Sequence, residues 1–171
     1  MLNLPLIFAP NPIFRKKALV VDKFDDELRQ CVSDMFETLY ANRGLGLAAN
    51  MVGLLKQIIV IDLQTEGKKN PLVLINPQII DASDETHRYT EASLSFPGIE
   101  AMVRRPKTIT IIYFDEMRND RKLTAEGFLS TVIQHEMDYL IGQTFLDRVS
   151  RLKRDSLLRK YKKLRASAVS V

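Results

Sequence analysis

Cysteine, histidine and tryptophan are scarce in this chain of 171 residues, which has one cysteine, two histidines and no tryptophan. A single cysteine cannot form an internal disulfide, and this favours a reducing, cytoplasmic setting. No segment approaches the roughly 20 consecutive apolar residues that a membrane-spanning helix needs. The N-terminal segment is interrupted by prolines and lacks a preceding basic region, which argues against a cleaved signal peptide. These absences predict a cytoplasmic protein with no membrane partner.

Charge is distributed unevenly along the chain, although the net charge of +4 is modest. Residues 151–171 carry eight lysines and arginines against one aspartate, so this segment alone has a charge of +7. The first 150 residues have a net charge of −3. The basic excess therefore belongs to the C-terminal segment and not to the chain as a whole.

The hydrophobic pattern predicts an α+β fold in a single domain that spans residues 1–171, a length sufficient to bury a core. Apolar residues recur at helical spacing in some segments, and others are rich in Ile and Val or alternate with threonine. We expect helices at residues 25–41, 125–142 and about 150–166, and strands at 57–63, 71–80, 107–116 and, after a loop, within 93–103. The expected architecture is a set of antiparallel or mixed strands around the central helix 125–142, with a basic helix at the C-terminus.

The central helix carries QHEMDYLIG, residues 134–142, which is one residue short of a zinc-binding helix signature. Two histidines four residues apart lie on one face of a helix and can bind one metal, while a glutamate between them acts on the metal's water. His135 and Glu136 fill the first two places, but Tyr139 stands where the second histidine belongs. The segment is therefore either a catalytic metal site with an unusual ligand or the remnant of such a site.

Two further segments, together with QHEMDYL, resemble the motifs of the peptide deformylases. These are metal hydrolases that remove the formyl group from the N-terminal methionine of new bacterial proteins. GLGLAANMVG at residues 44–53 is similar to G-x-G-[LI]-A-A-x-Q-[VI]-G, with Met51 in the place of glutamine. EASLS at residues 91–95 is similar to E-G-C-L-S, with Ala92 and Ser93 in the places of glycine and cysteine.

The third motif and the extent of the match strengthen the resemblance. QHEMDYL at residues 134–140 is similar to Q-H-E-x-D-H-L, with Tyr139 in the place of the last histidine. The similarity extends from NPIFR at residues 11–15 to FLDR at residues 145–148. Three motifs in the right order and spacing identify the chain as a member of the deformylase family, which implies that family's α+β fold.

Carried over by position, the resemblance implies a metal site, a catalytic site and a substrate site in one cleft. The family's ferrous or zinc ion has three ligand positions here, His135, Ser93 and Tyr139. Glu136 is the implied acid–base group, and Met51 and the backbone N–H of Leu94 stand at the positions of the oxyanion donors. The implied binding site for the N-terminal peptide of a nascent chain comprises Gly44, Leu45, Gly46, Glu91, Ser93 and Ile133.

Two of the three ligand positions lack the family's metal-binding groups. Cysteine binds as a thiolate, whose pKa of about 8.5 falls readily near a cation, whereas Ser93 offers only a neutral oxygen. The phenol of Tyr139, with an ordinary pKa near ~10, suits ferric haem iron better than a labile divalent ion. Met51 donates no hydrogen bond, and the loss of one oxyanion donor costs on the order of 3 kcal/mol. The sequence therefore predicts no metal or a weakly bound divalent metal, and deformylase activity that is lost or very weak.

Two other functions stay open from the sequence. The first is an active metal hydrolase in which His135 and Tyr139 bind the ion together with His87 or Glu136. The second is a non-catalytic module that binds N-terminal peptides or ribosomes, because a pocket can outlast its chemistry. A serine nucleophile at Ser93 with His135 as its base is disfavoured, since the chain has no G-x-S-x-G segment.

Several of these residues also have a purely structural interpretation. A lone helix histidine such as His135 is commonly a satisfied core residue, and Glu136 fits a buried carboxylate that is hydrogen-bonded to its neighbours. Cys31 lies on the apolar face of the first helix and is expected in the core. Arg104 and Arg105 precede a proline and are expected at a solvated edge.

The basic C-terminal helix suggests a partner of its own. Bacterial deformylases dock on the ribosome near the exit tunnel through their C-terminal helix, so residues 150–166 resemble that segment in role. Tyr161 is its only aromatic residue, so contacts to nucleic acid would be to phosphates and not to stacked bases. The alternative is a solvated helix face.

Overall fold

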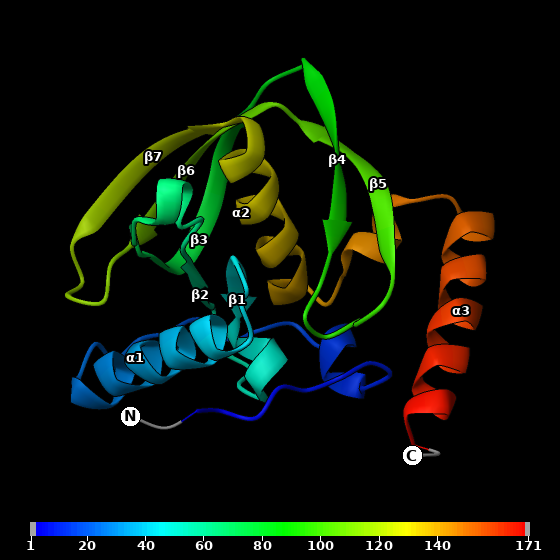
Figure 1. Ribbon diagram of the computed structural model, residues 1–171. Coiled ribbons are helices and arrows are strands. Elements are labelled where there is room, and N and C mark those ends of the chain that lie inside the picture. The colour runs from blue at the N-terminus through cyan, green and yellow to red at the C-terminus, as the bar shows by residue number, and fades with distance from the viewer. Residues whose placement is uncertain (1–2, 170–171) are drawn as a thin grey trace.

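Helix α2 (Gly127–Leu140) lies at the centre of the molecule, between two sheets (Figure 1). The computed structural model describes residues 3–169. A five-stranded sheet has the order β1-β2-β3-β6-β7, and β4 pairs with β5 in a second sheet, with every pairing antiparallel. The strands are β1 (Gly46–Ala48), β2 (Ile58–Ile61), β3 (Leu72–Ala82), β4 (Thr86–Ala92), β5 (Glu100–Pro106), β6 (Thr108–Phe114) and β7 (Asp120–Glu126).

The structure confirms the expected α+β fold, with strands around a central helix. The three expected helices are α1 (Asp26–Ala41), α2 and α3 (Arg151–Val169). The four expected strands correspond to β2, β3, β5 and β6. Strands β1, β4 and β7 were not predicted, and β7 occupies the start of the segment that was assigned to the central helix. That helix begins at Gly127 and not at residue 125.

Helix α1 begins with a side-chain cap and an acidic first turn. The side chain of Asp25 accepts a hydrogen bond from the backbone N–H of Leu28, which satisfies one of the free donors at the helix start. Met35 and Leu39 are fully buried on its inner face. Cys31 packs against the same core, as expected, and burial raises the pKa of its thiol.

Helix α2 is buried on nearly all sides because sheets cover it from both directions. It ends before Gly142, whose φ of 75° is in the left-handed region that stops helices. A Cβ atom at Gly142 would lie 2.8 Å from the carbonyl oxygen of Arg15, so glycine also allows the N-terminal segment to approach. Polar side chains on such a helix need partners inside the protein, and this requirement shapes the site.

Helix α3 lies at the outer edge of the molecule, on the side of β5 that faces away from α2 (Figure 1). Its buried Tyr161 contacts the ring of Phe96 at 5.8 Å between centroids and donates a hydrogen bond to the carbonyl of Ala9. The C-terminal helix is thereby joined to the N-terminal segment. In the described part of the chain, none of the helices has the length and apolar character needed to cross a membrane.

Candidate active site

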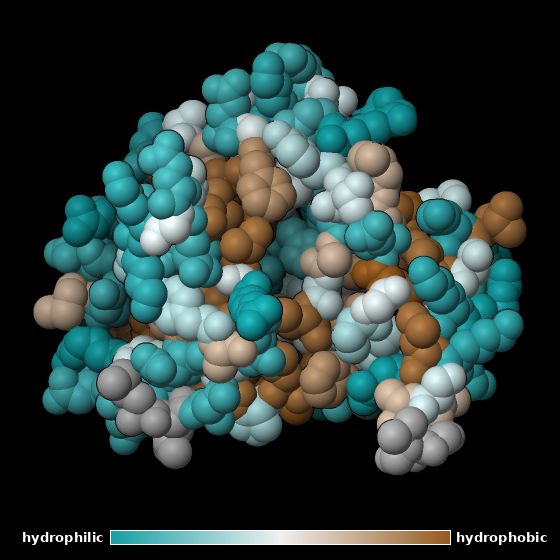
Figure 2. Space-filling view, viewed as in Figure 1, coloured by the Kyte–Doolittle hydropathy of each residue, from teal (hydrophilic) through white to brown (hydrophobic). Residues whose placement is uncertain are grey.

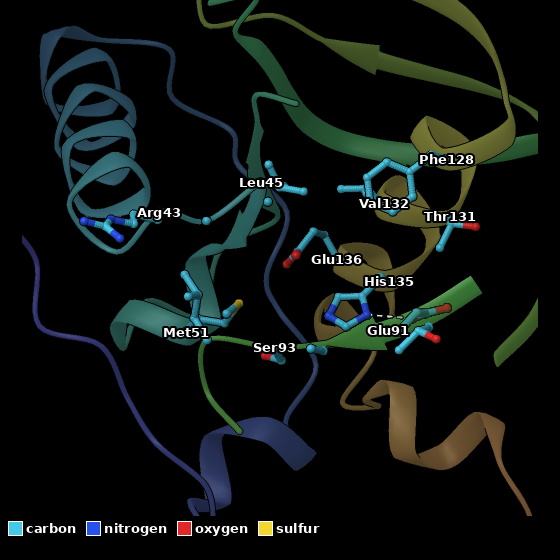
Figure 3. Close-up of a pocket in the computed structure, with 15 residues that line it drawn as sticks. Arg43, Leu45, Met51, Glu91, Ser93, Phe128, Thr131, Val132, His135 and Glu136 are labelled. Carbon is cyan, nitrogen blue, oxygen red and sulfur yellow. Dashed lines mark hydrogen bonds and ion pairs between the residues drawn. The ribbon is translucent and has the colours of Figure 1, made fainter. Parts of the chain in front are cut away.

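A cavity of about 370 Å³ opens between β1, the end of β4 and helix α2 (Figure 3). Figure 2 shows the hollow in the face of the molecule, with apolar side chains at its rim. Its apolar lining includes Leu45, Leu94, Phe128 and Val132. Phe128 is 39% exposed at the start of α2, which places an aromatic ring at the cavity surface.

The fold brings the three sequence motifs together at this cavity. Its lining includes most of the residues proposed for substrate binding, namely Gly44, Leu45, Gly46, Glu91 and Ser93. Ile133 is fully buried and is not part of the lining. The three positions proposed for catalysis, Met51, Leu94 and Glu136, all line the cavity. The roles of these residues stay predictions.

Ser93 and Tyr139, which stand at two of the three ligand positions, are hydrogen-bonded to each other. Their oxygens, Ser93 Oγ and Tyr139 OH, are 2.6 Å apart, and Ser93 Oγ also accepts the backbone N–H of Ser95 at 3.1 Å. Tyr139 is fully buried against Phe14, with 5.5 Å between ring centroids. Burial raises the pKa of the Tyr139 phenol, and the negative charge of Glu136 raises it further. Tyr139 is therefore a neutral phenol that already has a partner.

His135, at the third ligand position, belongs to a buried chain of charges. Its Nδ1 lies 2.7 Å from Glu91 Oε1, and Arg105 donates two hydrogen bonds to the Glu91 carboxylate, at 2.7 and 2.8 Å. Arg105 also contacts Asp138 at 3.0 Å, and Asp138 is paired in turn with Arg148. The prediction of a solvated edge was wrong for Arg105, which is 3% exposed, because two buried carboxylates hold it inside the protein.

The charges of this buried network fix the orientation of the His135 imidazole. Burial alone would raise the pKa of Glu91, but hydrogen bonds from Arg105 and His135 outweigh it and lower that pKa. Burial alone would lower the pKa of His135, but the hydrogen bond with Glu91 and the charge of Glu136 raise it. Glu91 is thus a firmly ionised partner, and Nε2 is the nitrogen of His135 that remains for other contacts.

Glu136 has an incomplete set of partners. A Cβ atom at Gly46 would lie 2.8 Å from Glu136 Oε1, so the carboxylate packs directly on the glycine backbone. The backbone N–H of Ala48 stabilises the charged form, but burial dominates and raises the pKa of Glu136 to about 7. Its other oxygen, Oε2, is buried without a hydrogen-bond partner among the described residues. Glu136 is thus a buried carboxylate that is hydrogen-bonded to a neighbour, as the structural interpretation expects, but one of its oxygens has no partner.

The side chains at the ligand positions do not fit a divalent ion of the kind that the family binds. Within residues 3–169, no group of three His, Cys, Asp or Glu side chains is placed to hold a metal. Ser93 and Tyr139 supply neutral hydroxyls where a thiolate and an imidazole would be needed. His87 lies 2.8 Å from Thr131 Oγ1 and does not line the cavity, so it does not complete the set.

The fold and the site define a deformylase-type protein, with a QHE helix beneath an apolar cleft and a glycine-rich strand beside it. The family model for polypeptide deformylase matches residues 4–155. The chain belongs to the peptide deformylase family.

Individual relatives match along most of their length. A peptide deformylase-like protein of Rickettsia conorii is 52% identical over 155 residues, which are 91% of this chain and 85% of that protein. The peptide deformylase of Brucella suis is 43% identical over 167 residues, 97% of this chain and 95% of that protein. A crystal structure of a peptide deformylase from Legionella pneumophila superposes with a TM-score of 0.90 at 34% identity, covering 96% of both chains.

Proposed function

We propose that this chain is a cytoplasmic deformylase-fold protein whose hydrolytic activity is lost or very weak, and whose cleft binds the N-terminal segment of nascent chains. The observation that carries the proposal is the 2.6 Å hydrogen bond between Ser93 Oγ and Tyr139 OH. Two positions that serve the family as metal ligands instead satisfy each other. The cavity beside them keeps its apolar lining and its volume of about 370 Å³.

The remaining groups are poorly matched to hydrolysis of a formamide. A free water molecule has a pKa of about 15.7, whereas a metal-bound one has a pKa near ~7. The pKa of Glu136 is about 7, so this carboxylate is far too weak a base to deprotonate free water. Met51 adds no hydrogen-bond donor for the developing oxyanion, because a thioether only accepts. The proton carrier is present without a nucleophile that it can activate.

Protein purified without oxygen should release no formate from formyl-Met-Ala-Ser beyond the rate given by the Glu136→Gln variant. The reason is that Glu136 has no activated water to deprotonate, so removing its charge changes nothing in the rate. Formate release and metal content, measured on the same sample, check this result. A stoichiometric divalent metal together with turnover that depends on Glu136 would contradict the proposal.

A second candidate is an active hydrolase with an unusual ligand set. It is favoured by the names of relatives such as the Brucella suis peptide deformylase, 43% identical over 167 residues, and by His135 and Glu136 in the cavity wall. In that case Tyr139 would bind the metal as a phenolate, and Tyr139→Phe would remove both metal and activity. Under our main proposal the same variant loses only a hydrogen bond to Ser93.

We also propose that α3 contacts ribosomal RNA through its exposed basic face. The side chains of Lys153, Arg159, Lys160, Lys162 and Lys163 are exposed along this helix. About five phosphate contacts imply an affinity that falls on the order of 10²-fold between 50 and 200 mM salt. Co-sedimentation with ribosomes over this range measures the slope.

Charge-reversal variants distinguish binding through α3 from a nonspecific effect of the protein's positive charges. The triple reversal Arg159→Glu, Lys160→Glu and Lys163→Glu should abolish co-sedimentation at 100 mM salt. Reversal of Lys68 and Lys122, exposed residues on other elements, should leave it nearly unchanged. Binding that does not respond to salt or to the triple reversal would rule out the phosphate-contact proposal.

A further inference from the structure

Glu136 offers the cavity a buried carboxylate oxygen that lacks a hydrogen-bond donor. The residue is 4% exposed, lines the cavity and has no hydrogen-bond partner at Oε2 among the described residues. The carboxylate packs closely on the backbone of Gly46. Glu91, the other carboxylate in the lining, is neutralised by Arg105. A buried acceptor without a donor is costly, so a ligand that brings a donor would gain from meeting it.

The side chains around Glu136 leave its Oε2 without a hydrogen bond. Figure 3 shows the carboxylate beside a space that is bounded by Met51, Ser93 and His135. The thioether of Met51 cannot donate a hydrogen bond. The hydroxyl of Ser93 is already shared with Tyr139. This space suits a group that is rich in donors.

These observations distinguish between the two chemical forms of a peptide N-terminus. A formyl group would bring one more oxygen acceptor to the space. Of the two oxyanion-donor positions that the family resemblance implies, only the backbone N–H of Leu94 could donate to it. A free α-ammonium group brings three N–H donors, and its positive charge would stabilise the ionised form of Glu136. Charge-assisted hydrogen bonds of this kind are about twice as strong as neutral ones. The geometry thus favours the free amine.

We propose that the cavity selects peptides with a free α-amino group and an apolar first residue over their formylated counterparts. The ammonium group would bind the Glu136 carboxylate, and the first side chain would lie among the apolar residues Leu45, Phe128 and Val132. This inference rests on the proposed function, since selective binding of the deformylated peptide is expected only of a cleft that does not hydrolyse formyl peptides. The ligand class is the deformylated N-terminus.

Calorimetric titration of the whole chain with Met-Ala-Ser and with formyl-Met-Ala-Ser tests the selectivity. We expect the free-amine peptide to bind at least roughly tenfold tighter, as a charge-assisted contact to a buried carboxylate should give. Acetyl-Met-Ala-Ser, which also lacks the ammonium group, should bind as weakly as the formyl peptide. Mass spectrometry of the recovered formyl peptide shows in the same experiment whether it has been consumed.

The isosteric Glu136→Gln variant identifies the charge as the cause. It should weaken Met-Ala-Ser binding at least roughly tenfold and change formyl-Met-Ala-Ser binding less than about twofold. A merely structural role of Glu136 would weaken both peptides together. Glu66→Gln, at an exposed site outside the cavity lining, is the matched control and should change neither.

The possible outcomes separate the two proposals. Equal affinities, or a preference for the formyl peptide, overturn the selectivity and leave the non-hydrolytic function standing. Consumption of the formyl peptide overturns the proposed function itself, whatever the affinities are. Failure of both peptides to bind overturns both proposals, because each requires a working peptide cleft.

Discussion

The triple variant Met51→Gln, Ser93→Cys and Tyr139→His is expected to retain a stoichiometric divalent ion and to hydrolyse formyl-Met-Ala-Ser. Positions 93 and 139 already lie in contact in the wild-type protein, with their side-chain oxygens 2.6 Å apart. A thiolate and an imidazole at these positions, together with His135, supply three ligands of the kind that zinc and ferrous sites use. A metal-bound water with a pKa near ~7 would match Glu136, whose pKa is about 7. Metal analysis and formate release measure the gain, which should be on the order of 10³-fold or more over the wild-type chain.

Variants that carry only some of these substitutions show how much each one contributes to metal binding and turnover. The double variant Ser93→Cys and Tyr139→His should bind metal but turn over roughly 10²–10³-fold more slowly than the triple variant, because Met51 still lacks an oxyanion donor. Glu136→Gln in the triple background should keep the metal and lose turnover. A triple variant that folds and binds metal yet remains inactive would show that the loss of function is not confined to these three side chains.

Replacing Arg105 with methionine should destabilise the protein by about 3–5 kcal/mol, because it leaves buried carboxylates without their cation. Arg105 contacts both Glu91 and Asp138, and the side chains of all three residues are 4% exposed or less. Urea denaturation followed by circular dichroism measures the loss. Arg104→Met, one residue away on the exposed side of β5, is the control and should change stability by less than about 0.5 kcal/mol.

A double variant shows whether the cost comes from the unpaired charge. Glu91→Gln combined with Arg105→Met removes one buried carboxylate along with its partner, while Asp138 keeps Arg148. The double variant should therefore be less destabilised than the sum of the two single variants. A simple sum, or a loss below about 1 kcal/mol for Arg105→Met alone, would contradict the view that this cation holds the network together.

The parts of the fold that sequence predicted well are those whose burial leaves a clear periodic pattern. Strand β2 consists of four buried residues, and α1 shows a capped, acidic start before its apolar face. Strand β4 escaped prediction because its THRYTEA segment is polar on both faces and acquires its partner only through pairing with β5. Strand β7, a polar edge strand, escaped prediction for the same reason. Its strand conformation depends on pairing with β6, which its own sequence does not indicate.

For the candidate site, the sequence indicated which residues lie together better than it indicated the contacts that they make. The motif spacing placed Glu136, Ser93 and Met51 at one cleft, and all three line the same cavity. Sequence did not predict the burial of Arg105, because its carboxylate partners lie 14 and 33 positions away and a local reading of RRP shows only charge. The unsatisfied oxygen of Glu136 was likewise beyond prediction, since it depends on which donors surround one atom.

The hydrogen bond from Tyr161 to the carbonyl of Ala9 connects the basic helix to the N-terminal segment. The N–H of Ala9 donates to the carbonyl of Ser95 at 2.9 Å, and the N–H of Ser95 donates to Ser93 Oγ at 3.1 Å. A continuous series of hydrogen bonds therefore joins α3 to Ser93 in the cavity lining, through the buried residues Ala9 and Ser95. The position of Ser93 thus depends on the packing of both ends of the chain.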